Sequence, residues 1–441
     1  MSLHLIELHD HAISIRAPDH TLLARSPGFA NIAGGAPVYG DAARQRARLH
    51  PREHFTQFWT QLNLDPLPVK HRQIRHAADL AHGHLAALTQ PLQFPDGAII
   101  GVPGTYNRNQ LAVLLGIVRQ LSFDAVGLVD LALLQAAASP ANECVILDLQ
   151  LHQAVLSRFR RVDGHLAREQ VVAVPFAGLL ALQEAWTGLI TDEFILQSRF
   201  DPLHTAETDQ YVYDRLDQWI ATLLDQDKAL LEINMKGTVH QAWLTRAQLE
   251  QRAQAVYARI AAELAALRGP DTVLHVRANQ LYLPGLAQSF PGLVALDDDA
   301  AMAACLQHID FIRRPPDKLQ FITRLPLANA APSVPPPQLR RPTHVLFNHS
   351  ALPLPAGRIM FGAAPADVQS TRVVPLPPES GIDGGIALVR NTRGLQLEVH
   401  TNAPVSVNGV PAQQNQMLAL GDLMRIGEAA ELRLILVEQG T

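Results

Sequence analysis

Residues 144–156 read CVILDLQLHQAVL, two apolar runs on either side of a short polar centre. This pattern predicts a β-hairpin with Asp148 near its tip. A turn that grips a phosphate needs glycines, because residues without a Cβ let backbone N–H groups come close to the phosphate oxygens. The segment contains no glycine, so we expect a hairpin that does not hold a phosphate.

The composition is that of a large globular protein. The chain has 441 residues, of which 48% are hydrophobic, enough for two or three domains with separate cores. The formal net charge of −5 gives no electrostatic reason to expect nucleic acid as a partner. No apolar run approaches the roughly 20 residues that a membrane span requires. Cys144 and Cys305 lie in apolar surroundings far apart in sequence, which suits buried thiols in a reducing compartment, so we expect a cytoplasmic protein.

A proline-rich stretch divides the chain. Residues 325–343 carry prolines at a density that blocks both helices and sheet ladders, and they predict a semi-rigid linker. Residues 1–324 alternate strand-like and helix-like patterns, whereas residues 344–441 contain short strand-like runs separated by Gly, Pro and Asn. We therefore predict an α/β domain, a linker and a small all-β domain.

The hydrophobic periodicity of the first domain predicts its main elements. The expected strands cover residues 5–15, 21–24, 98–102, 125–129 and 272–276, and the expected helices cover residues 109–121, 130–138, 206–224 and 244–268.

Three short motifs of this domain carry a family resemblance. Residues 98–110, AIIGVPGTYNRNQ, match a V-P-A-x-F/Y-N-x-x-Q pattern in which a strand leads into a helix. Residues 38–45, VYGDAARQ, match a G-x-A-A-K/R segment that is followed by a proline, here Pro51. Asp130, in LVDLA, stands where the pattern has a glutamate. Together, over about residues 1–310, they resemble the Hsp70 and actin-like ATPase superfamily, which implies two lobes with a nucleotide cleft between them.

The resemblance implies that two glycine-rich hairpins hold the phosphates of ATP and that a third loop holds the adenosine. The hairpin pattern D-x-G-T/S-T is here ELHDH at residues 7–11, and D-x-G-G-G-T is DLQLHQ at 148–153. The loop pattern G-G-x-x-x-x-P is RANQLYLP at residues 277–284. Side chains replace the glycines of all three loops: His9, Gln150, His152, Arg277 and Asn279. We expect these loops to have lost nucleotide binding, since several charge-assisted N–H contacts of roughly 1.5–3 kcal/mol each would be missing.

Acidic residues remain where the superfamily positions Mg²⁺ and the attacking water. Glu7, Asp130 and Asp148 occupy these places. A metal that serves phosphoryl transfer is useful only when the phosphates are held, so we interpret the three carboxylates as vestiges of a catalytic site. His9 and His11, two apart on an expected strand, form a candidate metal pair with His4 or His152. Two ligands without a defined third do not make a zinc centre, and we expect no metal and no cofactor.

The second domain carries a different resemblance. Residues 357–362 read GRIMFG, residues 405–410 read VSVNGV and residues 418–427 read LALGDLMRIG. This succession resembles the forkhead-associated (FHA) domain, and it implies a β-sandwich that reads phosphothreonine, with Arg358, Asn408 and Gly409 as candidate binding residues. Asp383 stands where that family has a serine that bonds phosphate. Because a carboxylate repels phosphate, we expect protein binding through another face.

Two functions stay open on this basis. The first is a non-catalytic pseudo-ATPase that acts as a scaffold or interaction protein, with protein partners bound through the FHA-like domain. The alternative is a divergent ATPase that binds ATP and Mg²⁺ and acts as a chaperone or forms filaments. The sequence favours the first, because three loops lack glycine together.

Overall fold

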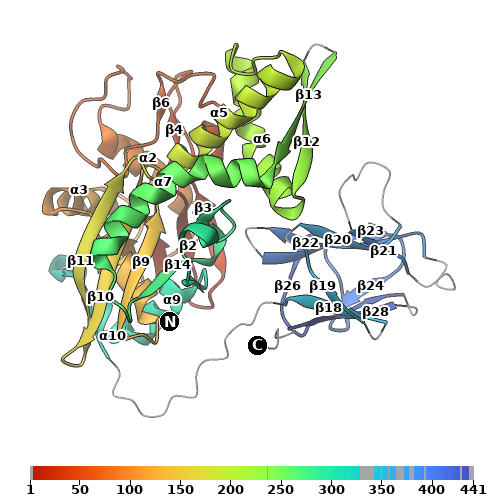
Figure 1. Cartoon of the computed structure of the whole chain (residues 1–441). Helices are drawn as coiled ribbons and strands as arrows, with labels where there is room; N and C mark the ends of the chain where they lie inside the picture. The colour runs from red at the N-terminus through yellow and green to blue at the C-terminus, as the bar shows by residue number, and fades with distance from the viewer. Residues whose placement is uncertain are drawn as a thin grey trace. The chain divides into compact units, whose positions relative to one another are not determined.

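The chain divides into two compact units in a computed structural model. The model describes residues 3–235, 237–327, 342–348, 350–355, 357–363, 372–376, 382–391, 394–427 and 430–436. The larger unit contains Met1–Asp217 and Lys228–Asn329, and the smaller contains Gln218–Asp227 and Ala330–Thr441 (Figure 1). Residues 328–341 of the expected linker lie outside the described residues, whereas Pro326 ends a strand, β17 (Arg324–Pro326).

The first sheet of the larger unit has the strand order β16-β8-β7-β1-β2-β3. Three consecutive strands pair antiparallel: β1 (His4–Glu7), β2 (Ile13–Arg16) and β3 (Leu22–Ser26). On the other side of β1 the strands run parallel to it: β7 (Ala98–Val102), β8 (Ala125–Asp130) and β16 (Phe321–Ile322). The carboxyl ends of β1, β7 and β8 therefore lie at one edge of the sheet.

The second sheet repeats this arrangement in the order β15-β14-β9-β10-β11-β17. Its antiparallel strands are β9 (Glu143–Leu149), β10 (Gln153–Val162) and β11 (His165–Pro175), and its parallel strands next to β9 are β14 (Val273–Arg277) and β15 (Leu293–Leu296). In both sheets, a three-stranded antiparallel meander continues, beyond its first strand, into parallel strands: β7, β8 and β16 in the first sheet and β14 and β15 in the second. The larger unit is thus an α/β structure with one topology used twice.

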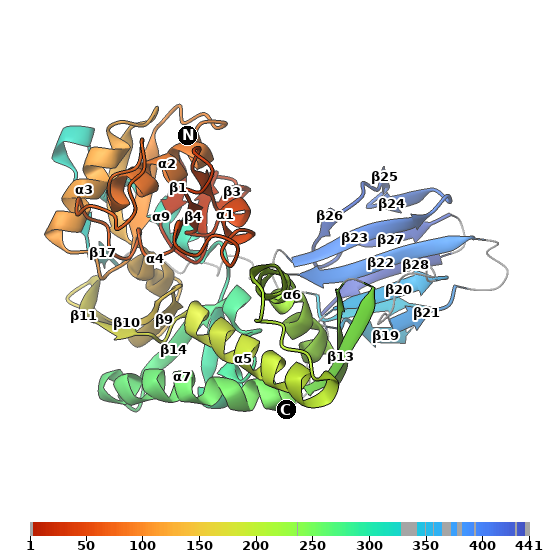
Figure 2. The same cartoon turned by 90° about the horizontal axis from the view of Figure 1, so that it is seen from above.

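Two helices fill the space between the sheets. Helices α4 (Leu131–Ala137) and α9 (Ala300–Gln307) contribute to one apolar core with residues of both sheets, such as Leu5 of β1 and Ile146 of β9 (Figure 2). Helices α2 (Ala77–Thr89) and α3 (Arg108–Val118) pack in a second core on the first sheet.

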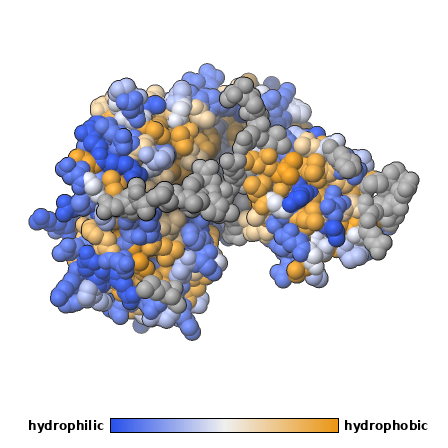
Figure 3. Space-filling model, turned by 90° about the horizontal axis from the view of Figure 1, so that it is seen from below, coloured by the Kyte–Doolittle hydropathy of each residue, from blue (hydrophilic) through white to orange (hydrophobic). Residues whose placement is uncertain are grey.

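The other elements extend the two halves. They are β4 (Ala30–Asn31), β5 (Val38–Tyr39), α1 (Asp41–Arg44), β6 (His54–Phe55), α5 (Leu179–Ser198), α6 (Ala206–Asp225), β12 (Lys228–Met235), β13 (Thr238–Thr245), α7 (Arg246–Leu267), α8 (Leu286–Ser289) and α10 (Ile309–Ile312). In the described part of the chain, no helix combines the length and apolarity needed to cross a membrane. On the face shown in Figure 3, hydrophobic surface lies in separate patches among hydrophilic residues.

Local sequence signals predicted several elements correctly. Residues 98–102 form β7, and the hairpin over 144–156 is formed by β9 and β10. Helix α3 begins with a capping box, in which Asn107 Oδ1 accepts from the Gln110 N–H and Gln110 Oε1 accepts from the Asn107 N–H, both at 3.0 Å. This reciprocal pair explains why asparagine and glutamine stand three residues apart at the start of the helix.

Two expectations about hairpins need correction. A single strand over residues 5–15 is wrong, because the chain turns at residues 8–12 between β1 and β2. Asp148 does not lie at a hairpin tip: it pairs with Val155 inside the β9–β10 ladder, and the turn is made by residues 150–152. At residues 150–152 the apolar alternation continues through Leu149 to Leu151, so periodicity alone does not mark that turn. The turn at residues 8–12 contains three consecutive polar residues, His9, Asp10 and His11, which interrupt the alternation.

The smaller unit contains two sheets around one core. Their strand orders are β19-β18-β28-β27-β24-β25 and β21-β20-β22-β23-β26. The strands are β18 (His344–Phe347), β19 (Ser350–Pro353), β20 (Arg358–Gly362), β21 (Arg372–Val374), β22 (Gly384–Asn391), β23 (Gly394–Thr401), β24 (Val405–Val407), β25 (Val410–Pro411), β26 (Gln416–Leu418), β27 (Leu423–Ile426) and β28 (Ala430–Ile435). Asn408 and Gly409 have φ of 54° and 83° and join β24 to β25, the left-handed pair that a two-residue hairpin turn requires.

The two units have separate cores and should unfold separately. We expect Phe361→Ala to destabilise the smaller unit and Phe159→Ala the larger one, each by about 3–5 kcal/mol, because both rings are fully buried and their loss leaves cavities. Differential scanning calorimetry of the full chain should show two transitions, with each variant lowering the midpoint of only one. If both substitutions shift the same transition, the two cores are not independent.

Candidate functional site

The two β-hairpins at equivalent ends of the two sheets face one another. The first turn, residues 8–12, follows β1, and the second, residues 150–152, follows β9. His9 Nε2 forms an ion pair with Asp148 Oδ1, and the Leu151 N–H donates to Asp10 Oδ1 at 2.9 Å. Ligands of open α/β sheets bind beyond the carboxyl ends of parallel strands, so this meeting point is the candidate site.

Side chains fill the turn of the second hairpin. Gln150 is 3% exposed, and its Nε2 donates to Asp148 Oδ2 at 2.9 Å while its Oε1 accepts from Gln153 Nε2 at 2.9 Å. Leu151 is 2% exposed and packs in a small apolar cluster with Phe29 and Ala43 from the first half of the unit. The second hairpin is therefore anchored to the first half by an apolar side chain.

Helix α5 starts directly against this hairpin. The N–H groups of Leu179 and Leu180 donate to the carbonyl oxygens of Gln150 and Leu151 at 2.8 and 2.9 Å. The free N–H groups at a helix N-terminus commonly bind anions, but these two already have carbonyl partners. The contact is close because the residue before the helix is Gly178.

The third loop reaches the first hairpin through Arg277. This residue ends β14, and its Nη1 lies 2.9 Å from Oε2 of Glu7, which is fully buried. Arg16 Nε lies 3.4 Å from the other oxygen of Glu7, and the amide oxygen of Gln135, in the orientation that satisfies both amide atoms, accepts from Arg277 Nε and Nη2 at 2.8 Å. The Glu7 carboxylate is thus held between two protein cations.

Asp130 has a different set of partners. Its Oδ1 accepts from the Ala132 N–H at 2.9 Å and so caps helix α4, and its Oδ2 lies 2.5 Å from Arg168 Nη1. Burial raises the pKa of Asp130, and the Arg168 cation opposes that shift. Capping and ion pairing account for this carboxylate without a ligand.

Asp148 stays ionised through protein contacts. Burial alone would raise the pKa of Asp148, but electrostatic interactions with His9 and Arg277 and hydrogen bonds with His9 and Gln150 lower it to about 2. Burial raises the pKa of Asp10, partly offset by His9. The charge that a metal ion would neutralise at Asp148 is already balanced.

The other predicted residues of the loops have separate contacts. His152 Nε2 lies 2.9 Å from Thr56 Oγ1, and Asn279 lies in a short 3-10 helix, Ala278–Gln280, after β14. His9 and His11 lie in the first turn and not on a strand, with ring centroids 5.9 Å apart. Across the described ranges, no group of three or more His, Cys, Asp or Glu side chains could hold a metal ion.

The hydrophobic periodicity of the sequence gave no indication that Arg16, Gln135, Arg168 and Gln280 contact the predicted site residues and the end of β9. Gln280 Nε2 donates to the Leu149 carbonyl at 2.9 Å, and its Oε1 accepts from the Leu149 N–H at 3.4 Å, which holds the end of β9. The sequence shows that this glutamine lies in the third loop, three residues after Arg277. It does not show which residue the glutamine contacts, because that residue, Leu149, is 131 positions away in the chain.

A second set of contacts joins the two halves of the larger unit. Arg44, at the end of α1, lies 2.7 Å from Asp217 of α6, and Arg48 forms an ion pair with Glu184 of α5. Both guanidinium groups lie over the ring of Tyr213, at 5.2 and 4.8 Å from its centroid. These contacts hold the two halves together at a place separate from the hairpins.

The candidate binding residues of the smaller unit also have internal partners. Arg358 forms an ion pair with Glu398, whose Oε2 lies 3.1 Å from His400 Nε2. Asn408 Nδ2 donates to Asp422 Oδ1 at 2.8 Å, and Asn408 Oδ1 accepts from the Leu423 N–H at 3.0 Å. Asn408 and Gly409 thus build a turn, and the Arg358 charge is balanced in place.

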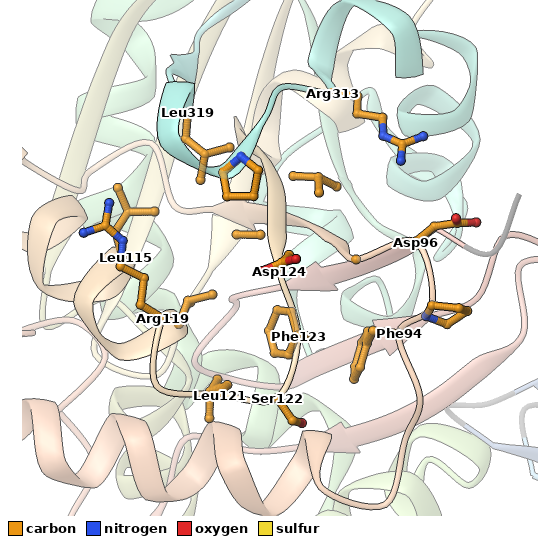
Figure 4. Close-up of a pocket in the computed structure, with 16 residues that line it drawn as sticks. Phe94, Asp96, Leu115, Arg119, Leu121, Ser122, Phe123, Asp124, Arg313 and Leu319 are labelled. Carbon is orange, nitrogen blue, oxygen red and sulfur yellow. The ribbon is translucent and has the colours of Figure 1, made fainter.

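A hollow of about 480 Å³ lies at the opposite edge of the first sheet (Figure 4). Asp96 and Gly97 precede β7 and Asp124 precedes β8, so the hollow borders the amino ends of the strands, whereas Glu7 and Asp130 end their strands. Its rim includes the exposed residues Arg119 and Arg313. The hollow is therefore separate from the hairpin site.

Gly178 should be required for the contact between helix α5 and the second hairpin. A Cβ there would lie 2.5 Å from Gln150 O, Leu151 O and Gln153 N, all backbone atoms that cannot move independently. We expect Gly178→Ala to lower the free energy of unfolding by about 2 kcal/mol. The control is Gly188→Ala in the same helix, where a Cβ meets only the end of the Arg252 side chain at 3.4 Å; it should be neutral or stabilising by up to about 1 kcal/mol. Equal effects in urea denaturation would contradict the close approach.

Asp148 should make stability depend on acid pH. Its folded pKa of about 2 lies below the ordinary value of 3.8, so its ionised form stabilises the fold above pH 3.8 and this contribution is lost as the pH falls to about 2. We expect the wild type to lose roughly 2 kcal/mol more than Asp148→Asn across this interval. The difference between their urea denaturation curves from pH 5 to pH 2 measures it, and parallel curves would exclude a buried ion pair at His9.

No protein-family model matches this chain, and no curated protein matches it.

Proposed function

We propose that the chain is a non-catalytic, Hsp70/actin-like pseudo-ATPase that serves as a scaffold or interaction protein with an FHA-like binding module. The observation that carries this proposal is the filled meeting point of the two hairpins. There, Leu151 packs with Phe29 and Ala43 and His9 pairs with Asp148, and in this proposal these side chains stand in place of bound phosphates.

The repeated topology supports the two-lobed part of the proposal. Each sheet has a hairpin at the same place in its strand order, and the two hairpins meet across the unit. An ATPase of this superfamily needs that geometry for two loops to grip one nucleotide. In this chain, the same geometry brings side chains of the two hairpins into contact with each other instead.

The energetics oppose nucleotide binding. A phosphate at the hairpins would have to separate the buried His9–Asp148 pair, and breaking a buried ion pair costs about 3–5 kcal/mol. It would also approach the carboxylates of Glu7, Asp10 and Asp148, whose charges repel it. Without glycine, the turns offer no close backbone N–H groups in return.

The same contacts support a structural role for the carboxylates. Glu7 and Asp148 are each paired with protein cations, and Asp130 caps a helix and pairs with Arg168. These acids stabilise the larger unit. They are not free to position Mg²⁺ and water.

The smaller unit supports binding of a protein partner by a face other than a phosphothreonine site. A phosphate would compete with Glu398 for Arg358 and would meet the exposed carboxylate of Asp383. The net charge of −5 favours protein over nucleic acid. We place the protein in the cytoplasm as part of this proposal.

A nucleotide titration tests the proposal directly. We expect no heat of binding and no shift of the melting temperature with millimolar ATP and Mg²⁺, since buried side chains and the His9–Asp148 pair fill the meeting point of the hairpins. The comparison variant is Asp148→Ala. Micromolar ATP binding with Mg²⁺-dependent hydrolysis that Asp148→Ala abolishes would overturn the proposal in favour of a divergent ATPase that acts as a chaperone or forms filaments.

A further inference from the structure

The larger unit carries a two-stranded ribbon, β12 and β13, with one buried face and one exposed face. Along β12 the side chains of Ala229, Leu231 and Ile233 are buried, and the residues between them are exposed. This alternation places Lys228, Leu230 and Glu232 together on the exposed face.

The exposed face contains an uncovered apolar pair. Leu230 and Trp243 are directly opposite each other in the ladder and are 36% and 48% exposed. Lys228 Nζ lies 4.6 Å from the centroid of the Trp243 ring. Single exposed apolar residues are common, but here two of them are cross-strand neighbours with a lysine beside them and Glu232 two residues along the strand from Leu230.

The two edges of the ribbon differ. At Trp243, the outer edge of β13 is occupied by the Gln197 side chain, whose Oε1 accepts from the Trp243 N–H and whose Nε2 donates to the Trp243 carbonyl, both at 2.8 Å. Within the described residues, we find no hydrogen bond from another element to the backbone of β12. A strand edge that keeps unpaired N–H and C=O groups is a template for a further strand.

We propose that β12 pairs antiparallel with β12 of a second copy of this chain, with a two-fold axis at Leu230. In this register Lys228 of each copy faces Glu232 of the other, and Leu230 faces Leu230. Opposite charges directly across an antiparallel pair stabilise it, and like charges destabilise it. The interface is self-complementary, as a two-fold dimer requires.

Other two-fold registers lose this complementarity. An axis at Glu232 places two carboxylates opposite each other, and an axis at Lys228 places two ammonium groups opposite each other. An axis at Leu231 puts Leu230 against Glu232. Of these four registers, only the one centred on Leu230 places each charged side chain opposite a side chain of opposite charge. It also brings Ala229 and Leu231 of the two copies together on the buried face.

Charge reversal tests the pairing. The full chain should show a monomer–dimer equilibrium in sedimentation at roughly 10–100 µM, the weak range expected of one short strand pair. Glu232→Lys should weaken the dimer by roughly tenfold, because each copy then presents two lysines to the other. The double variant Lys228→Glu with Glu232→Lys should restore it, and Glu263→Lys, an exposed reversal on α7, should leave it unchanged.

Cross-linking locates the axis. Opposed residues of an antiparallel pair have Cα atoms about 4.5–5.5 Å apart, within the span of a disulfide. Leu230→Cys should therefore form an intermolecular disulfide under mild oxidation, whereas Glu232→Cys, which faces Lys228, should form little. The native Cys144 and Cys305 are buried and do not interfere.

Three results would overturn the proposal. These are a chain that stays monomeric at all concentrations, a dimer that Glu232→Lys does not weaken, and equal cross-linking of the two cysteine variants. None of them bears on nucleotide binding, so this inference and the proposed function can fail separately.

Discussion

The contact between the two hairpins is the constraint on which the rest of the larger unit depends. His9 from one sheet and Asp148 from the other form a buried pair, and neither group is tolerated alone in an apolar interior. The pair therefore ties the turn after β1 to β9 of the second sheet, beside the apolar core of α4 and α9 that also joins the two sheets. Leu151, Gln150 and the start of helix α5 then pack around it. A site of this kind holds itself together with the same groups that would otherwise hold a ligand.

Local features of the fold were predictable from the sequence, and long-range ones were not. The capping box at Asn107 and the turn at Asn408 are determined by neighbouring residues, so their signals are complete in a short window. The turn at residues 150–152 has no such signal, because apolar residues continue to alternate as far as Leu151. Helix α5 and strands β12 and β13 were not predicted either. Their apolar residues face neighbours from distant segments, which periodicity does not identify.

In the candidate site too, local features were predictable from the sequence and long-range contacts were not. The absence of glycine at residues 150–152 follows from the residue types alone, and the Gln150 side chain lies buried in that turn. The sequence did not indicate which residues the side chains of the site contact. Arg277 and Glu7 are 270 residues apart in sequence, and Arg168 and Asp130 lie on different sheets. The carboxylates looked like remnants of a metal site, and their cations come from segments that carry no motif.

The Gln197 amide at the edge of β13 has a consequence for assembly. It supplies one donor and one acceptor in the way that a neighbouring strand would, so the ribbon can accept an added strand on one side only. A ribbon open on both sides would let copies add without end and grow into a fibre. With Trp243 capped in this way, the proposed pairing of β12 leaves no matching strand edge at Trp243 for a third copy, which favours a closed pair over an open-ended polymer.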